Sequence, residues 1–325
     1  METTVAIWMY DNDNGDIPKK KLVDELKARG IKVIDNFDLN ECYILNGEVF
    51  LSSGENLSQI DILYHMYADH ESIHQREVLW ALEGKSVTVI NGVDAYLKCR
   101  DKFIANFIMR ESEVNVPESA LLNKNVNLDV VKNIFYKWGA AVYKPREGHG
   151  AAGIIKFVDA EQFYDFIQYS KSYEENFYIE KYIDFGDRDY RVEVIDNEII
   201  GGYSRVKSHS FKTNVTAGGF VEECESSGHH ISLALKAANA LQIDGTIVDM
   251  VRSVKDDKFY VLEVNYLLGV FVEAAVAARY GKGQDILPIF FKEHDDRKLK
   301  MLVNYIMKKV EEKKNETNHS CIISE

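Results

Sequence analysis

Oxygen-bearing side chains interrupt two apolar stretches late in the chain, GTIVDM and VLEVN. They are Asp249 in the first stretch and Glu263 and Asn265 in the second. Residues two apart on a strand share a face, so we expect Glu263 and Asn265 to project together. A hairpin that sets Asp249 opposite Glu263 brings all three onto one face, whereas a register shifted by one residue scatters them.

Such a trio suits a metal site. An acid within an apolar strand is costly to bury unless something compensates its charge. Magnesium takes hard oxygen ligands, needs few protein carboxylates and bridges phosphates. The sequence therefore predicts that Asp249, Glu263 and Asn265 hold Mg²⁺, and the alternative is an exposed sheet face that carries ordinary acids.

A glycine-rich stretch, VYKPREGHGAAGIIKF, offers a second chemical feature well before these strands. It sets Lys144 in a predicted strand just before Gly148, Gly150 and Gly153. Glycines allow the backbone to approach a ligand and aim its N–H groups at it, while the lysine adds a fixed point charge. The stretch is thus a candidate phosphate cover, although taken alone it also suits a plain glycine-rich turn.

Composition limits the classes of partner. The 325 residues are 46% hydrophobic and 28% charged, which predicts a globular chain of about two domains. The net charge of -13 argues against nucleic-acid or membrane-surface binding, because both need a basic footprint. The four cysteines lie far apart without C-x-x-C spacing, and the start lacks a basic region before its short apolar run. We therefore expect a cytoplasmic protein without a signal peptide.

The elements that must position these residues alternate in type in the first part of the chain. Apolar runs at 4–9 and 31–37 flank the amphipathic stretch PKKKLVDELKARG, which is a β-α-β pattern. A turn at Asn46-Gly47, a strand in IDILYHMY, a helix over 72–83 and a strand in SVTVING follow. This pattern predicts a doubly wound α/β domain without the dinucleotide-binding glycine motif.

An α+β region follows. We expect helices over 94–110 and 129–138, strands in AAVYKP and IIKFV on either side of the glycines, and the helix AEQFYDFIQYS before FYIEKYID. The remainder predicts a hairpin that turns at Asp196-Asn197, the helix ISLALKAANAL, the two acid-bearing strands and a last helix.

Taken in order, these segments resemble the ATP-grasp superfamily of carboxylate–amine ligases, from near the start to about residue 290. DKFIANFIMRESEVNVPES resembles the segment in which a lysine, here Lys102, precedes a helix and a proline turn. VYKPREGHGAAGI resembles the phosphate loop of the family, whose strand lysine, here Lys144, touches the α- and β-phosphates. DRDYRV places the ribose-binding acid of the family at Asp189. YIEKYI resembles the hinge that reads adenine through backbone groups, here Glu180, Lys181, Tyr182 and Ile183.

The later segments continue the resemblance. SRV places a family arginine at Arg205, facing the transferred phosphoryl group. FKTNVTAGG is similar to a segment of RimK-type glutamate ligases and glutathione synthetase, which puts Asn214 near the phosphates. Arg205, Lys144 and Asn214 are thus the implied catalytic residues, and the strand pair matches the Mg²⁺ ligands already predicted. Arg191 suits either a substrate carboxylate or a structural ion pair.

The resemblance implies a fold and cofactors. We expect an ATP-grasp fold that combines α/β and α+β parts, and ATP with Mg²⁺, two ions, for which Mn²⁺ could substitute. The implied division is an N-terminal Rossmann-like pre-ATP-grasp domain at 1–97, a lid subdomain at 98–180, a metal and nucleotide subdomain at 181–310 and a polar tail at 311–325.

The implied function is ATP-dependent ligation of a carboxylate to an amine, with amino-acid or peptide substrates, through an acylphosphate that releases ADP and phosphate. Ala217 stands where RimK-type enzymes have an arginine, and the bulky YLLGVF follows the metal strand, so the identity of the substrates does not carry over. The alternatives are a small-molecule kinase and a non-catalytic nucleotide-binding regulator; the complete metal set favours catalysis. A homodimer or homotetramer is compatible with this function.

Overall fold

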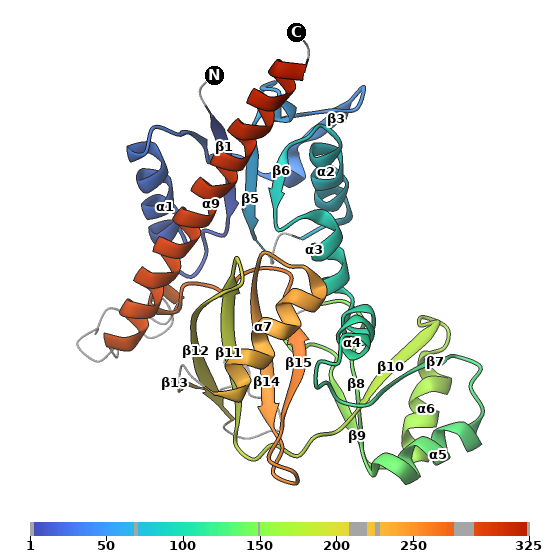
Figure 1. The fold of residues 1–325 in the computed structure, drawn as a ribbon. Helices are drawn as coiled ribbons and strands as arrows, with labels where there is room; N and C mark the ends of the chain where they lie inside the picture. The colour runs from blue at the N-terminus through green and yellow to red at the C-terminus, as the bar shows by residue number, and fades with distance from the viewer. Residues whose placement is uncertain are drawn as a thin grey trace.

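A computed structural model of the chain describes residues 3–67, 71–148, 150–207, 220–224, 228–275 and 289–323. Its strands form three main sheets, each accompanied by helices (Figure 1). The predicted alternation of elements is confirmed over most of the described chain, and the differences fall at two helices.

The first sheet is parallel and has the strand order β2-β1-β5-β6. The turn of the small β3-β4 hairpin places Asn46 and Gly47 at positive φ, as the Asn-Gly signal predicts. The doubly wound pattern predicted for this region is therefore present. Its elements are β1 (Thr4–Met9), α1 (Asp16–Ala28), β2 (Lys32–Ile34), η1 (Leu39–Glu41), β3 (Tyr43–Leu45), β4 (Glu48–Phe50), η2 (Leu57–Gln59), β5 (Ile62–Met66), α2 (Ile73–Gly84) and β6 (Thr88–Ile90).

The helical pattern predicted over 94–110 is confirmed, and the chain forms two helices there. These are α3 (Val93–Arg100) and α4 (Lys102–Glu111), separated at Asp101. Asp101 has an extended backbone, and its carboxylate accepts hydrogen bonds from the amides of Phe103 and Ile104. An N-cap aspartate satisfies amides that have no partner within the helix, so a new helix begins here and Lys102 lies in its first turn.

The second sheet is antiparallel, with the order β7-β10-β8-β9. Its core contains Phe135 of α5 and Phe163 of α6, which contact each other. The sheet and its helices form the lobe at the lower right of Figure 1. Its elements are β7 (Ser119–Asn123), α5 (Leu128–Trp138), β8 (Ala141–Tyr143), β9 (Ile155–Phe157), α6 (Ala160–Ser170) and β10 (Asn176–Lys181).

The third sheet, also antiparallel, has the order β13-β12-β11-β14-β15. On one face, Val192, Val248 and Val264 pack against α7. The residues that alternate with them include the charged Arg191, Glu193, Asp249 and Glu263. Asp196 and Asn197 both adopt positive φ at the β11-β12 turn, which confirms the predicted hairpin. The elements are β11 (Arg188–Ile195), β12 (Glu198–Val206), β13 (Phe220–Glu223), α7 (His229–Leu241), β14 (Gly245–Arg252) and β15 (Phe259–Val264).

The last helix, α9 (Ile289–Ile323), connects two regions of the molecule. Leu302, Ile306 and Val310 of α9 are buried in the same cluster as Ile7 of β1 and Leu22 of α1, and in Figure 1 the helix crosses the first sheet beside α1. Beyond residue 310, α9 continues through residue 323, and the side chains of residues 311–316 are mostly exposed. The polar tail predicted from residue 311 is thus helical, and its status as a separate segment stays a prediction. The domain boundaries near residues 97 and 180 stay predictions.

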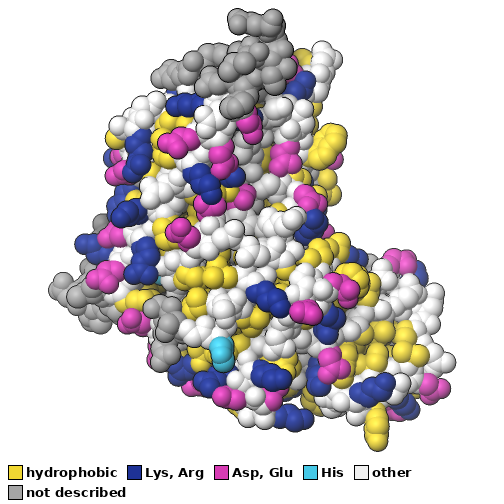
Figure 2. Space-filling view, viewed as in Figure 1, with side chains coloured by type: hydrophobic (Ala, Val, Ile, Leu, Met, Phe, Trp, Pro, Cys, Tyr) yellow, Lys and Arg dark blue, Asp and Glu magenta, His cyan; other side chains and the backbone are white. Residues whose placement is uncertain are grey.

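The surface carries both signs of charge. On the face drawn in Figure 2, basic and acidic side chains are interspersed, and neither sign gathers into one large patch. Within the ranges that the structure describes, no helix is long and apolar enough to cross a membrane.

Candidate active site

The predicted pairing of the acid-bearing strands is confirmed. Asp249 on β14 lies directly opposite Glu263 on β15. Immediately beyond this pair the register shifts by one residue, so that Met250 pairs with Val261. A β-bulge redirects side chains, and here the shift sets the two carboxylates side by side. With the register of the outer part of the hairpin, Asp249 would have faced Leu262 instead.

Two arginines hold the Asp249 carboxylate. Arg191 on β11 places Nε 2.9 Å from Oδ1 and its terminal nitrogen 2.9 Å from Oδ2, and Arg205 on β12 lies 3.0 Å from Oδ2. Burial raises the pKa of Asp249, but the two guanidinium groups outweigh it and the pKa lies below its ordinary value. The carboxylate is therefore ionised at neutral pH. Arg191, which the sequence left open, contacts the predicted metal ligand.

Asp189 makes its principal contact with Arg205. The Arg205 Nε donates to Asp189 Oδ1 at 3.1 Å, and a second guanidinium nitrogen donates to Oδ2. Asp189 is only 3% exposed. This bidentate pair fixes the plane of the Arg205 side chain. The ribose role that the family resemblance implied for Asp189 stays a prediction, and the geometry favours a role in orienting Arg205.

Two buried lysines extend from the lid side toward β15. Lys102 Nζ lies 3.3 Å from Glu263 Oε1 and donates to the Gly148 carbonyl at 2.6 Å. Lys144 Nζ donates to the Leu262 carbonyl at 3.2 Å. Two cations from separate segments thus contact two adjacent residues of β15, of which Glu263 pairs with Asp249.

The glycine loop adopts backbone conformations that favour glycine. Gly148, Gly150 and Gly153 have φ of +109°, +69° and +73°. A Cβ on Gly153 would also come within 2.7 Å of the ring of Pro145, so this position excludes larger residues. The three glycines predicted as a cover thus have a local conformational reason, and their contact with phosphates stays a prediction.

The hinge residues contribute mainly backbone groups. The amides of Lys181 and Tyr182 already donate to the carbonyls of Glu118 and Ala140, at 2.8 and 3.0 Å. Adenine recognition by 180–183 stays a prediction, and it would use backbone groups other than these two amides. The Glu180 side chain instead points to the lysine side of the site, where Oε2 lies 2.6 Å from Lys144 Nζ.

The Asn265 side chain lies just past the end of β15. Its Nδ2 donates to the Ile247 carbonyl at 2.9 Å, which fixes the amide through its nitrogen. Oδ1 is the atom that would bind a metal, and this role stays a prediction. Asp249 Oδ1 is buried, and its contact with Arg191 Nε at 2.9 Å is an ion pair without hydrogen-bond geometry. Oxygens of Asp249, Glu263 and Asn265 fit the chemistry of Mg²⁺. The predicted catalytic Asn214 lies outside the described residues.

The sequence did not predict the two ion pairs that Arg100 makes, referred to below as the Arg100 relay. Its NH1 lies 2.8 Å from Glu147 Oε2, beside the first loop glycine, and its Nε contacts Glu71 Oε1. Glu71 also accepts hydrogen bonds from Tyr96 at 2.6 Å and Tyr266 at 3.1 Å. One buried guanidinium thus links the first domain to the glycine loop. The partners lie far apart in the sequence, so no local pattern could have identified it.

Solved structures share this architecture. The D-alanine–D-alanine ligase from Bacillus anthracis complexed with ATP superposes with a TM-score of 0.63 at 17% identity, covering 97% of this chain and 99% of that one. The ATP-grasp ligase PsnB complexed with minimal precursor, Mg and ADP gives a TM-score of 0.60 at 18% identity, covering 92% and 98%. These likenesses show that the chain has the ATP-grasp fold.

Residues 99–273 match the RimK-like ATP-grasp domain. The coenzyme gamma-F420-2:alpha-L-glutamate ligase of Methanococcus maripaludis is 31% identical over 215 residues, which are 61% of this chain and 70% of that protein. The chain belongs to the RimK-like ATP-grasp family. It is an ATP-dependent ligase that forms a C–N bond between a carboxylate and an amine, and it uses ATP and Mg²⁺.

Proposed function

We propose that this chain joins an amino acid to an acceptor by activating a carboxylate as an acylphosphate at the cluster between β15 and the glycine loop. The observation that carries this proposal is that Lys102 and Arg205 contact the paired carboxylates of Glu263 and Asp249. Lys144 reaches the same place, at the Leu262 carbonyl. The amino-acid substrate is supported by the name of the M. maripaludis relative, an alpha-L-glutamate ligase.

The reaction has two steps. A carboxylate oxygen attacks the γ-phosphorus of ATP, the bond from that phosphorus to the bridging oxygen breaks, and ADP leaves. The amine nitrogen then attacks the acyl carbon, loses a proton, and phosphate departs. The protein supplies position and charge for both steps.

Each cation has a distinct place in this scheme. Lys102 and Lys144 hold phosphate oxygens from the lid side, exchanging their present contacts with Gly148 and Leu262 for the nucleotide. Arg205 approaches from the opposite sheet in an orientation fixed by Asp189. Asp249, Glu263 and Asn265 would hold Mg²⁺, which when bound neutralises phosphate charge.

We further propose two magnesium ions, on the grounds of charge. The cluster contains four cations and four carboxylates that pair with one another. The cations are Lys102, Lys144, Arg191 and Arg205, and the carboxylates are Glu180, Asp189, Asp249 and Glu263. ATP brings about four negative charges into this neutral and buried site, and uncompensated buried charge is costly. Two divalent ions restore neutrality, whereas one leaves two charges unmatched.

The test combines MgATP, a panel of amino acids and peptides, and hydroxylamine as the amine. We expect one carboxylate to give a hydroxamate together with equal amounts of ADP and phosphate. With ATP saturated as its magnesium complex, further free Mg²⁺ should still raise the rate if a second ion binds. ATP binding without hydroxamate across the panel would contradict the ligase mechanism, and phosphate retained on a hydroxyl substrate would show a kinase.

A further inference from the structure

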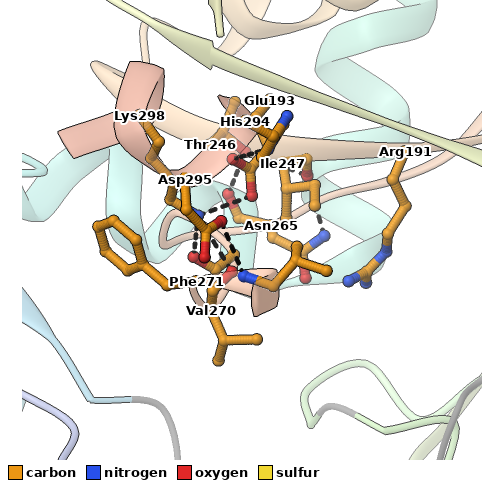
Figure 3. A network of polar contacts seen from close by, with 12 residues as sticks. Arg191, Glu193, Thr246, Ile247, Asn265, Val270, Phe271, His294, Asp295 and Lys298 are labelled. Atoms are coloured by element: carbon orange, nitrogen blue, oxygen red, sulfur yellow. Dashed lines mark hydrogen bonds and ion pairs between the residues drawn. The ribbon is translucent and has the colours of Figure 1, made fainter. Parts of the chain in front are cut away.

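Lys298 of α9 is fully buried, and its ammonium contacts three acceptors. Nζ donates to Glu193 Oε1 at 2.8 Å, to the Val270 carbonyl at 3.2 Å and to the Gly269 carbonyl. The other Glu193 oxygen lies 3.1 Å from His294 Nε2. Figure 3 shows these side chains converging on one place beside Val270 and Phe271. Because both charged groups are fully buried, removing either partner would leave the other without compensation.

The segment 269–273 is held by side chains from other parts of the fold. The amides of Val272 and Glu273 donate to the two oxygens of Asp295, at 2.9 and 2.8 Å. The Phe271 amide donates to the Tyr10 hydroxyl at 2.9 Å. Asp295 precedes Lys298 by three residues on α9, so both side chains lie on one helix face. That face therefore binds both the carbonyls and the amides of the segment.

Two glycines make room for this network. A Cβ on Gly269 would come within 2.5 Å of Glu193 Oε1, and one on Gly201 within 2.7 Å of His294 Nδ1. Contacts that close require the neighbour to move. The backbone of the segment thus packs directly against the carboxylate of Glu193, with no space for a side chain between them.

The segment follows the predicted metal-binding strand in the sequence, and it lines a cavity. It begins four residues after Asn265, and Glu193 shares a strand face with Arg191, which binds Asp249. Phe271 and Glu273 line a cavity of about 390 Å³ between α1 and α9. The cavity lies just past the carboxyl end of β1, where open α/β sheets commonly bind ligands, and its volume suits a small organic molecule.

We propose that Lys298, neutralised by Glu193, is a positioning residue for the organic substrates of the ligation. It fixes the segment 269–273, which forms a wall of the cavity. Its ammonium binds Glu193 and this segment, not the described residues assigned to the nucleotide. This inference rests on the proposed function. It adds that the nucleotide and the organic substrates bind at different parts of the site.

The experiment compares two variants with a matched control. Lys298→Met removes the donor and leaves the buried Glu193 carboxylate without its cation. We therefore expect this variant to unfold at lower urea concentration than the unmodified protein. The double variant Glu193→Gln/Lys298→Met removes both charges and should recover most of that stability. Lys308→Met is the control. Lys308 lies on an exposed part of the same helix, where it pairs with Asp196 of the β11-β12 turn.

Three readouts separate positioning from general stability. In the double variant, the carbonyls of Gly269 and Val270 lose the ammonium, whereas the amides of 271–273 keep Tyr10 and Asp295 as partners. Because the segment is then held from one side only, we expect it to open more often and these amides to exchange hydrogen about tenfold faster. We expect about a tenfold higher KM for the panel carboxylate that the unmodified protein converts fastest. The dissociation constant for the magnesium complex of a non-hydrolysable ATP analogue should stay unchanged.

The outcomes are distinguishable. If the double variant shows the exchange rates and KM of the unmodified protein, Lys298 only stabilises the fold and the inference is wrong. An equal weakening of nucleotide binding would also overturn it. If the unmodified protein forms no hydroxamate, the proposed ligase mechanism fails, whereas the exchange rates still decide whether Lys298 positions the segment.

Discussion

Glu263→Gln should separate catalysis from stability. The Glu263 side chain is 27% exposed, and its one ion pair, with Lys102, spans 3.3 Å. A partly exposed pair contributes about 1 kcal/mol or less, so we expect the midpoint of thermal unfolding to fall by under ~4 °C. If Glu263 holds charge against the transferring phosphoryl group, turnover should fall about 100-fold or more, which corresponds to roughly 3 kcal/mol of transition-state stabilisation.

The neighbouring ligand provides a contrast. Asp249→Asn should also remove turnover, but it leaves the buried guanidinium groups of Arg191 and Arg205 without their shared carboxylate. Breaking a buried ion pair costs about 3–5 kcal/mol, so this variant should unfold at clearly lower urea concentration. Asp257→Asn, at the exposed end of the same hairpin, is the control for both measurements.

The assay measures ADP release and hydroxamate formation together, and urea unfolding is followed by circular dichroism on the same samples. A Glu263→Gln protein with turnover within twofold of the unmodified enzyme would remove Glu263 from the metal site. An Asp249→Asn protein as stable as the unmodified enzyme would refute the argument that the arginines depend on this carboxylate.

Three further predictions concern the contacts around the cluster. Arg100→Lys should raise the dissociation constant for MgATP several-fold and speed proteolysis of the glycine loop, because one ammonium cannot reproduce the bridge between Glu71 and Glu147; unchanged values for both would contradict the relay. Asn91→Ala should lower the free energy of unfolding by about 3 kcal/mol or more in urea titration, since it removes three buried hydrogen bonds to the backbone of 245 and 266. Burial raises the pKa of Asp295 to about 6. Between about pH 4 and 6 the folded state therefore binds more protons than the unfolded state, so the free energy of unfolding falls as pH rises. Asp295→Asn should flatten this dependence of stability on pH in urea titrations, and an unchanged dependence would assign it to other groups.

Local patterns in the sequence accounted for most of the elements and for the central feature of the site. Alternating apolar residues define β14 and β15, and the pairing of Asp249 with Glu263 follows from requiring a common face for their side chains. The bulge after Asp249 was not predictable in the same way, because the pairing of the outer residues does not reveal where the register shifts. The break at Asp101 carried a usable signal, an aspartate before a helical stretch.

Contacts between distant segments account for what the sequence did not show. Lys298 follows Glu193 by more than a hundred residues, and each alone reads as an ordinary charged residue of an amphipathic element. Only the fold reveals that both are fully buried and in contact. The composition of the chain after residue 310 is polar, which favours a solvated tail, yet α9 continues because its earlier residues are anchored on the first sheet.

Strand β11 connects the two parts of the proposed site. Asp189, Arg191 and Glu193 alternate along it and therefore share one face. Asp189 orients Arg205, Arg191 holds Asp249, and Glu193 neutralises Lys298 beside the cavity wall. Replacing such buried charges by apolar residues is often neutral or stabilising in proteins, so stability alone does not explain three of them on one strand. Their spacing on one strand offers the explanation. The strand holds the proposed phosphoryl-transfer groups and the proposed wall of the substrate cavity at a fixed separation, which a reaction between two bound molecules requires.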